Sequence, residues 1–136
     1  MGTNLFRNLF ALVDGKRQDI LKNGELSCAF FASAILLQFG LIKTGHTTVA
    51  GLVKDLENSD WEKITEPRPG AALIWEPLDF DGETHSHCGF YIGDDQAISN
   101  SANSGVPAQH HLTYGIEDGK VGRKVVAIYW HNMLKN

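Results

Sequence analysis

Apolar residues recur at helical spacing through the first half of the chain. Over residues 4–14 they predict an amphipathic helix, which Gly15 interrupts, with apolar positions at Leu5, Phe6, Leu9, Phe10 and Val13. A second helix is predicted from Ala29 to Phe39, with Ser27 as its N-cap and Gly40 as its C-terminal cap. Because this second segment is apolar on nearly all sides, we expect it to be buried.

A third helix is predicted directly after Thr47 or Thr48, either of which can act as its N-cap. Its apolar positions follow the i, i+3, i+4, i+7 rule and are Val49, Leu52, Val53 and Leu56. The polar residues between and after them are expected to face solvent, and they are Lys54, Asp55 and Glu57. The first half of the chain is therefore predicted to be helical.

After Gly70 the pattern changes to short apolar runs that are typical of β-strands. The four predicted strands are Ala71 to Trp75, His87 to Gly93, Ala97 to Asn100 and Arg123 to Trp130. Two loops are predicted, Pro77 to Ser86 and Ser101 to Gln109, and residues 93–96 form a tight connection. Helices followed by a meander of strands predict the α+β class, with N-terminal helices packed on an antiparallel sheet.

Composition limits the domain count and the classes of partner. The 136 residues, of which 43% are hydrophobic, fit one domain spanning 1–136 with one core. The formal net charge of −4, with no Lys/Arg cluster in the sequence, argues against nucleic acid or an anionic membrane as a partner. The most apolar stretch, Cys28 to Phe39, is about half of the ~20 residues that a bilayer span requires.

Localisation and assembly stay open at this point. The start Met1-Gly2-Thr3-Asn4 lacks the basic n-region of a secretory signal, so a cytoplasmic location and export by a non-classical route both fit the sequence. The two cysteines could form one disulfide, but a chain of this size does not need one. The sequence does not indicate an oligomeric state.

Cys28 is the first candidate for chemistry, because it lies at the start of the second predicted helix. A thiolate, rather than a thiol, attacks carbonyl carbon, so a catalytic Cys needs its pKa lowered from about 8.5. The unpaired N–H groups of a helix N-terminus favour the thiolate and could also donate to an oxyanion. The alternative is that Cys28 is only a small buried hydrophobic residue.

His87 is the second candidate, because it is a polar residue at the start of an apolar strand. Strand alternation puts His87, Gly89 and Tyr91 on one face, whereas Cys88 points away from the groups that His87 addresses. An imidazole close to Cys28 would complete an activated nucleophile. The alternative is a surface histidine at a strand end.

Three segments that contain these residues resemble, in order, the signature blocks of the NlpC/P60 cysteine peptidases. The family pattern is a Cys that starts a helix, a strand led by Pro-Gly, and a hairpin that begins His-x-Gly. The matching segments are Ser27-Cys28-Ala29-Phe30-Phe31-Ala32-Ser33, Arg68-Pro69-Gly70-Ala71-Ala72-Leu73-Ile74-Trp75 and His87-Cys88-Gly89-Phe90-Tyr91-Ile92-Gly93-Asp94-Asp95-Gln96-Ala97-Ile98. The similar stretch runs from about Ser27 to Ser101.

The resemblance implies a papain-like α+β fold, with Cys28 as the nucleophile and His87 as the general base. It also implies hydrolysis of amide bonds in bacterial cell-wall peptides, often next to D-γ-glutamyl residues, without a metal or an organic cofactor. The partner would then be a peptidoglycan stem peptide or a similar small amide.

Two positions depart from the family pattern. Ala71 stands where the family usually has Asp, and the third catalytic residue, commonly His, matches Ser99. Ser99 or Asn100 could hydrogen-bond the outer nitrogen of the catalytic imidazole, and a one-residue shift in the hairpin exchanges them. His110 or His111 could take this role if the following loop folds back, and otherwise they are exposed loop residues.

The sequence also contains residues that suggest other chemistries and functions. A zinc site could draw on His85, His87, Cys88, His110 and His111, but no standard ligand spacing occurs. The acidic loop with Asp79, Asp81 and Glu83 lacks the EF-hand layout, and the three Trp residues fit a core as well as a carbohydrate groove. A catalytically silent peptide- or glycan-binding module, or a structural domain, stays the alternative to an enzyme.

Overall fold

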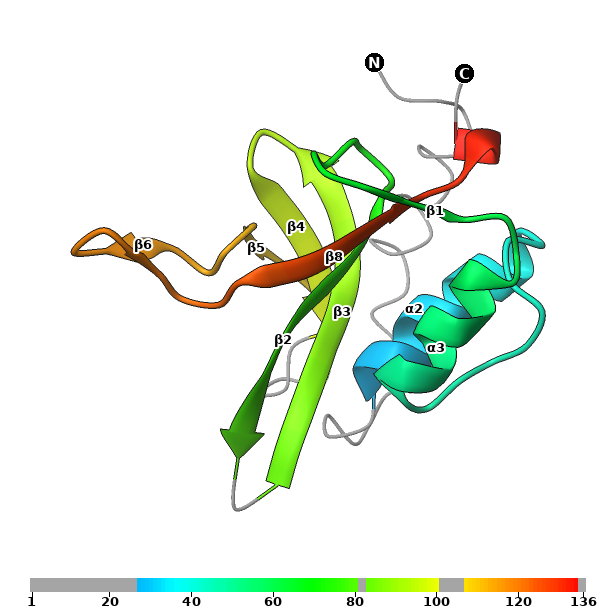
Figure 1. The fold of residues 1–136 in the computed structure, drawn as a ribbon, viewed down its shortest axis with the longest axis horizontal. Coiled ribbons are helices and arrows are strands. Elements are labelled where there is room, and N and C mark those ends of the chain that lie inside the picture. The colour runs from blue at the N-terminus through cyan, green and yellow to red at the C-terminus, as the bar shows by residue number, and fades with distance from the viewer. Residues whose placement is uncertain (1–26, 81–82, 101–106, 135–136) are drawn as a thin grey trace.

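The computed structural model describes residues 27–80, 83–100 and 107–134. The helix predicted over residues 4–14 lies outside this part of the chain. Within it, two helices are followed by strands, as Figure 1 shows. The predicted α+β class is therefore confirmed.

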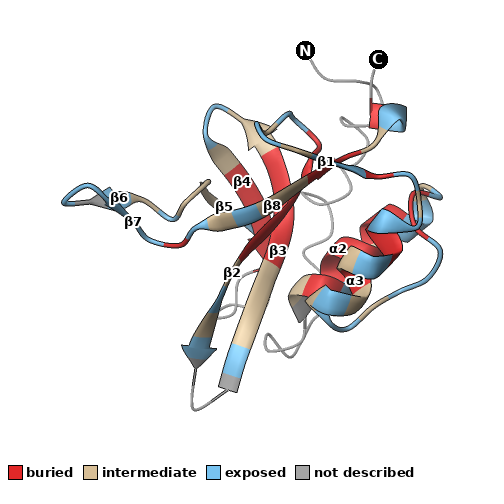
Figure 2. Cartoon of the chain, in the orientation of Figure 1, coloured by how far each residue is buried: buried red, intermediate tan, exposed pale blue. Residues whose placement is uncertain are grey.

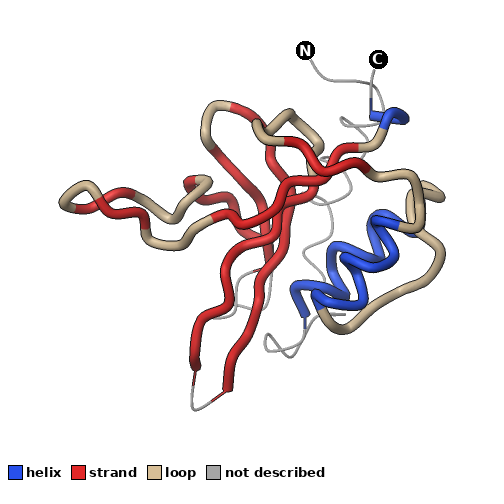
Figure 3. Tube along the Cα trace, viewed as in Figure 1, coloured by secondary structure: helices blue, strands red, loops and turns tan. Residues whose placement is uncertain are grey.

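The two helices pack on one face of a six-stranded antiparallel sheet (Figure 3). They are α2 (Ser27–Gln38) and α3 (Val49–Glu57). In spatial order the strands are β1 (Glu62–Ile64), β8 (Val125–Trp130), β2 (Ala72–Phe80), β3 (Glu83–Gly93), β4 (Gln96–Asn100) and β5 (Pro107–His111). A separate two-stranded sheet is formed by β6 (Ile116–Glu117) and β7 (Lys120–Val121), and a short 3-10 helix, η2, covers Asn132–Leu134.

Helix α2 ends at Gln38, and Gly40 is its C-terminal cap, as predicted. The Gly40 φ of +70° suits glycine, and the N–H groups of Gly40 and Leu41 donate to the carbonyls of Leu37 and Leu36 at 3.0 Å. The predicted burial on all sides is only partly correct, because Phe30 is 38% and Leu37 is 42% exposed. At its other end α2 begins at Ser27, whose side chain is outside the described part of the structure.

Helix α3 is capped by Thr48, whose hydroxyl accepts a hydrogen bond from the Gly51 N–H at 3.0 Å. Leu52 and Leu56 are buried, as their spacing predicts. The prediction that Asp55 faces solvent is wrong: Asp55 is buried and binds the segment that connects α2 with α3. Its carboxylate accepts hydrogen bonds from the N–H groups of Lys43 and Thr44, from Ser59 Oγ and from His46 Nε2, the last at 2.7 Å.

The β2–β3 hairpin is longer than the sequence pattern predicts. The predicted loop from Pro77 to Ser86 is wrong, because residues 77–80 continue β2 and residues 83–86 begin β3. Its polar residues are compatible with strands because this part of the hairpin extends beyond the core, where its residues are partly or fully exposed (Figure 2). The second predicted loop is wrong over residues 107–109, which belong to β5, whereas residues 101–106 lie outside the described part.

The tight connection predicted over residues 93–96 is confirmed. Asp94 and Asp95 both have positive φ, +53° and +58°, as the two central residues of a type I′ turn require. The Asp95 N–H also donates to the Tyr91 hydroxyl at 3.1 Å. This turn sets the register of β3 against β4.

The hydrophobic core lies between the helices and the centre of the sheet, where buried residues concentrate in Figure 2. Phe31 of α2 meets Phe90 of β3 edge-on, with ring centroids 6.4 Å apart. Phe90 therefore marks the face of β3 that packs on the helices, and residues 87, 89 and 91 belong to the opposite face. Leu36 and Leu56 of the helices are fully buried in this core, and Leu73 and Trp75 of β2 are fully buried on the face of the sheet that carries residues 87 and 89.

The buried carboxylate of Asp55 predicts a pH-dependent contribution to stability. Burial raises the pKa of Asp55, but the hydrogen bonds from His46, Lys43, Ser59 and Thr44 outweigh burial and lower this pKa from 3.8 to about 2. The stabilisation is therefore present above pH 3.8 and is lost as the pH falls toward about 2. We expect Asp55→Asn to reduce the free energy of unfolding by about 2 kcal/mol at neutral pH, as measured by urea denaturation.

The matched control is Asp60→Asn, because Asp60 is exposed and its φ of +68° is a conformation that Asn tolerates. This variant should unfold at the wild-type urea concentration. Equal stability losses in the two variants would contradict the role assigned to the Asp55 carboxylate.

Candidate active site

Cys28 lies in the first turn of α2, beside the β3 strand. Its Sγ is 4.0 Å from the carbonyl oxygen of Ser86, a long contact for a thiol donor. The pairing of β3 with β4 runs only as far as Gly89 and Ser99, so Cys28 reaches β3 just beyond the end of that pairing. The thiol is partly buried and is not in a disulfide.

Three groups hold Cys28 in a state that favours the thiolate. A hydrogen bond from the Cys88 thiol is the largest influence and lowers the pKa of Cys28, whereas burial raises it. A hydrogen bond with His87 and the charge of its ring lower this pKa further, and so does the Cys88 N–H. The net effect is a Cys28 pKa far below its usual value.

Strand alternation predicted that Cys88 points away from the group that His87 addresses. This prediction is wrong, because Cys88 and His87 both interact with Cys28. Cys28 sits at the edge of β3, so that His87 from one face and Cys88 from the other both interact with it. The hydrogen bond with Cys28 raises the pKa of Cys88, and burial and the charge of Cys28 raise it further, so Cys88 favours the thiol form. The pKa shifts of the two thiols thus favour a thiolate at Cys28 and a buried thiol donor at Cys88.

His87 lies in β3 as predicted, directly opposite Trp75 of β2. The two ring centroids are 5.2 Å apart, and the Trp75 Nε1–H donates to the Leu112 carbonyl at 2.8 Å. Trp75 is completely buried, so it forms a rigid wall behind the imidazole. This Trp belongs to the core, one of the two roles considered for it.

Ser99 supplies the predicted hydrogen bond to the outer nitrogen of His87. The distance from His87 Nε2 to Ser99 Oγ is 3.0 Å, and Ser99 is buried. The same oxygen lies 2.7 Å from His110 Nε2 and 3.2 Å from the Tyr114 hydroxyl. Asn100, the other candidate for the third residue, is also buried and follows Ser99 in β4, so alternation turns it to the opposite face of the strand.

The register of three strands explains this cluster. Ser99 is paired with Gly89 of β3 on one side and with Ala108 of β5 on the other, so its direct neighbours are small. His87 and His110 are the diagonal neighbours, two residues along each flanking strand, and long side chains reach across such diagonals. Both imidazoles can therefore lean over the small residues toward Ser99.

His110 and His111 are not exposed loop residues, because both belong to β5 and are partly buried. The His111 ring lies in the following turn, where its Nδ1 accepts from the Thr113 N–H at 3.0 Å. Tyr114 was missed by the sequence analysis. Its ring stacks on His110 with centroids 4.0 Å apart and an interplanar angle of 14°, and no sequence pattern marks such a contact.

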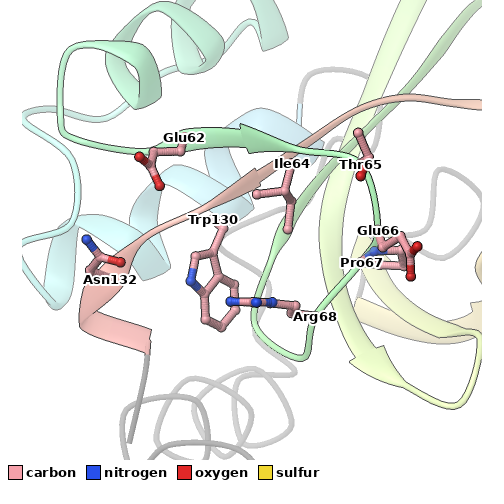
Figure 4. Close-up of a pocket in the computed structure, with 8 residues that line it drawn as sticks. All are labelled: Glu62, Ile64, Thr65, Glu66, Pro67, Arg68, Trp130 and Asn132. Atoms are coloured by element: carbon pink, nitrogen blue, oxygen red, sulfur yellow. The ribbon is translucent and has the colours of Figure 1, made fainter.

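A separate pocket of about 500 Å³ lies where β1 meets the end of β8 (Figure 4). The Arg68 guanidinium lies over the Trp130 ring at 5.2 Å from its centroid. The lining residues include no cysteine or histidine and are Glu62, Ile64, Thr65, Glu66, Pro67, Arg68, Trp130 and Asn132. This pocket is therefore distinct from the cluster around Cys28.

Residues 27–80, 83–100 and 107–134 contain no group of three or more His, Cys, Asp or Glu side chains arranged to hold a metal ion. The described helices also include none that is long and apolar enough to cross a bilayer. No model of a known protein family matches the chain, and a search of curated proteins finds no match.

Gly89 is predicted to be essential for the contact between His87 and Ser99. A Cβ at this position would collide with the Ile98 carbonyl oxygen and lie 2.8 Å from Ser99 Cβ, so β3 and β4 would have to separate. We expect Gly89→Ala to lower the free energy of unfolding by about 1–3 kcal/mol. It should also slow alkylation of Cys28 by iodoacetamide at about pH 6, because the separation moves His87 away from Ser99.

Gly45→Ala is the control for Gly89→Ala, because a Cβ at Gly45 meets only Ser33 Oγ, at 4.0 Å. Urea denaturation and the alkylation rate should match wild type in this variant. A Gly89→Ala protein with the same two properties as Gly45→Ala would show that the close approach of β3 and β4 is not needed.

Proposed function

We propose that the protein is a cysteine-dependent amidase or endopeptidase that acts through an acyl-enzyme at Cys28. The observation that carries the proposal is the position of Cys28 in the first turn of α2, where Cys88 and His87 of β3 both interact with its thiol. These two interactions lower the pKa of Cys28, although burial raises it. Nucleophilic catalysis requires a thiolate beside an imidazole that a third group orients. Here the thiolate is in the first turn of a helix, and Ser99 orients the imidazole of His87. A cysteine that only packs in a core has no need of this arrangement.

In the first half of the reaction the Cys28 thiolate attacks the carbonyl carbon of the amide. The negative charge that forms on the carbonyl oxygen is stabilised by unpaired N–H groups of the first turn of α2. His87 then gives its proton to the amide nitrogen, the C–N bond breaks, and the amine leaves. The acyl group stays on Cys28 as a thioester.

In the second half, water attacks the thioester carbonyl while His87 takes a proton from that water. The C–S bond breaks, the acid leaves, and the Cys28 thiolate and the His87 imidazolium are restored. Ser99 accepts a hydrogen bond from His87 Nε2 throughout, which keeps the opposite ring nitrogen toward the sulfur. No metal or organic cofactor takes part in this scheme.

The resemblance to NlpC/P60 peptidases supports a papain-like arrangement of the α+β fold and a substrate class. The Cys of that family starts a helix and its His lies in a strand of the sheet, as Cys28 and His87 do here. We therefore infer that the substrate is a peptidoglycan stem peptide or a similar isopeptide-like amide. The proposal is independent of the pocket at Trp130.

The test is release of new free amines from cell-wall peptide fragments, followed by mass spectrometry. Wild-type protein should cleave at least one amide in the panel, and Cys28→Ala should abolish cleavage because the nucleophile is gone. His87→Ala should slow cleavage by about 100-fold or more, the usual effect of losing a general base. His131→Ala is the control histidine variant, because His131 packs on Trp61 away from the Cys28 cluster, and it should cleave at the wild-type rate.

Two results would overturn the proposal in different ways. Equal or negligible labelling of Cys28 and Cys88 by iodoacetamide at about pH 6, with no cleavage, would favour the catalytically silent binding module. Fast labelling of Cys28 without cleavage across the panel would point to acyl transfer onto an acceptor other than water.

A further inference from the structure

We propose that His110 is a positioning residue that acts on His87 through Ser99. It takes the hydroxyl proton of Ser99 in a hydrogen bond, so that the Ser99 oxygen can only accept a hydrogen bond from His87. The single third residue of a catalytic triad is thus replaced by a two-residue relay from β4 and β5. This inference rests on the proposed function of Cys28 and His87 and deepens it.

The direction of each hydrogen bond in this network follows from one group that can only accept, the His111 carbonyl oxygen. His110 Nδ1 lies 2.8 Å from the His111 carbonyl oxygen, which can only accept, so Nδ1 carries a proton. A neutral His110 then has a bare Nε2, which must accept. The atom 2.7 Å away is Ser99 Oγ, whose single proton therefore points to His110.

The two lone pairs of Ser99 Oγ are then filled by donors. The Tyr114 hydroxyl, 3.2 Å away, donates to one of them, because the only Ser99 proton is already used. His87 Nε2, 3.0 Å away, donates to the other and must carry a proton. In neutral His87 the bare nitrogen is consequently Nδ1, the nitrogen left to take the thiol proton of Cys28.

The relay also fits the charged state of the site. When His87 is an imidazolium beside the Cys28 thiolate, its Nε2 still donates, and Ser99 still presents an acceptor. A protonated His110 would instead donate to Ser99, which would free the Ser99 proton to point at His87 and would add a second positive charge nearby. The relay thus requires a neutral His110.

The surroundings of His110 favour its neutral form. Burial lowers the pKa of His110, and the charges of His87 and His111 lower it further, against the hydrogen bond to the His111 carbonyl, which raises it. The groups that face it are His87 from β3, Ser99 from β4, His111 in its own strand and the stacked Tyr114. The part of the chain that the structure describes shows no carboxylate bonded to the His110 ring that would favour its protonation.

The test compares variants that keep or remove the acceptor at residue 110. His110→Phe keeps a flat ring that can stack on Tyr114 but cannot accept the Ser99 proton, whereas His110→Gln offers an amide oxygen that can. Gln109→Ala, an exposed change in the same strand, is the control. Circular dichroism checks that each variant is folded, and the rate of Cys28 alkylation by iodoacetamide is measured across about pH 4–9.

We expect His110→Phe and Ser99→Ala each to lower the alkylation rate at about pH 5–6 by roughly 10-fold, with His110→Gln closer to wild type and Gln109→Ala unchanged. The double variant Ser99→Ala/His110→Phe should be no worse than Ser99→Ala alone, because both changes interrupt one path. His110→Phe with a wild-type pH profile, or additive losses in the double variant, would overturn the relay.

Nitrogen-15 NMR of the His87 ring gives a second readout that needs neither a reactive thiol nor a substrate. In its neutral form, wild-type His87 should carry its proton on Nε2, and His110→Phe should show a mixture of the two tautomers. A wild-type His87 protonated on Nδ1 would overturn the relay whatever the alkylation data show. If the tautomer is as expected but Cys28 alkylates like an ordinary thiol, the relay stands and the proposed amidase fails.

Discussion

The meeting of Cys28 with His87 at the edge of β3 is the interaction on which the functional account depends. It joins the start of α2 to the middle of the sheet, next to the place where the β3–β4 pairing of the described residues ends, at Gly89 and Ser99. Beyond that point the strand edge can receive the sulfur, and residues from both faces reach it. Cys88 donates from the side of the helices and His87 approaches from the other side, so the Cys28 sulfur can hold a negative charge while partly buried.

The strands next to this contact position the side chains that hydrogen-bond to Ser99. Small residues directly opposite Ser99 leave space for the imidazoles of His87 and His110 on its two diagonals, and Trp75 closes the space behind His87. Each member of the network is held by a backbone group or a neighbouring ring, so the proton positions follow from its geometry. A serine can occupy the third position because a second histidine, one strand further, orients its hydroxyl.

Local sequence patterns were enough to predict the elements that carry the site. The C-terminal cap of α2 at Gly40, the N-cap of α3, the strand of His87 and the turn at Asp94 and Asp95 each depend on residues close in sequence, and the structure confirms them. Counting through the hairpin also led to Ser99. Patterns that depend on distant partners failed. The buried Asp55 is satisfied by backbone N–H groups of another segment, and residues 77–80 and 83–86 become strands by pairing with each other.

The most direct test of the account is the pKa of Cys28, measured from the carbon-13 shift of its Cβ between about pH 3 and pH 10. The account predicts a midpoint well below the usual value of about 8.5, and a rise toward that value in His87→Ala. Cys88 provides an internal reference, because it should stay a thiol over the same range. A Cys28 midpoint at or above about 8.5, unchanged by the loss of the His87 ring, would contradict the account.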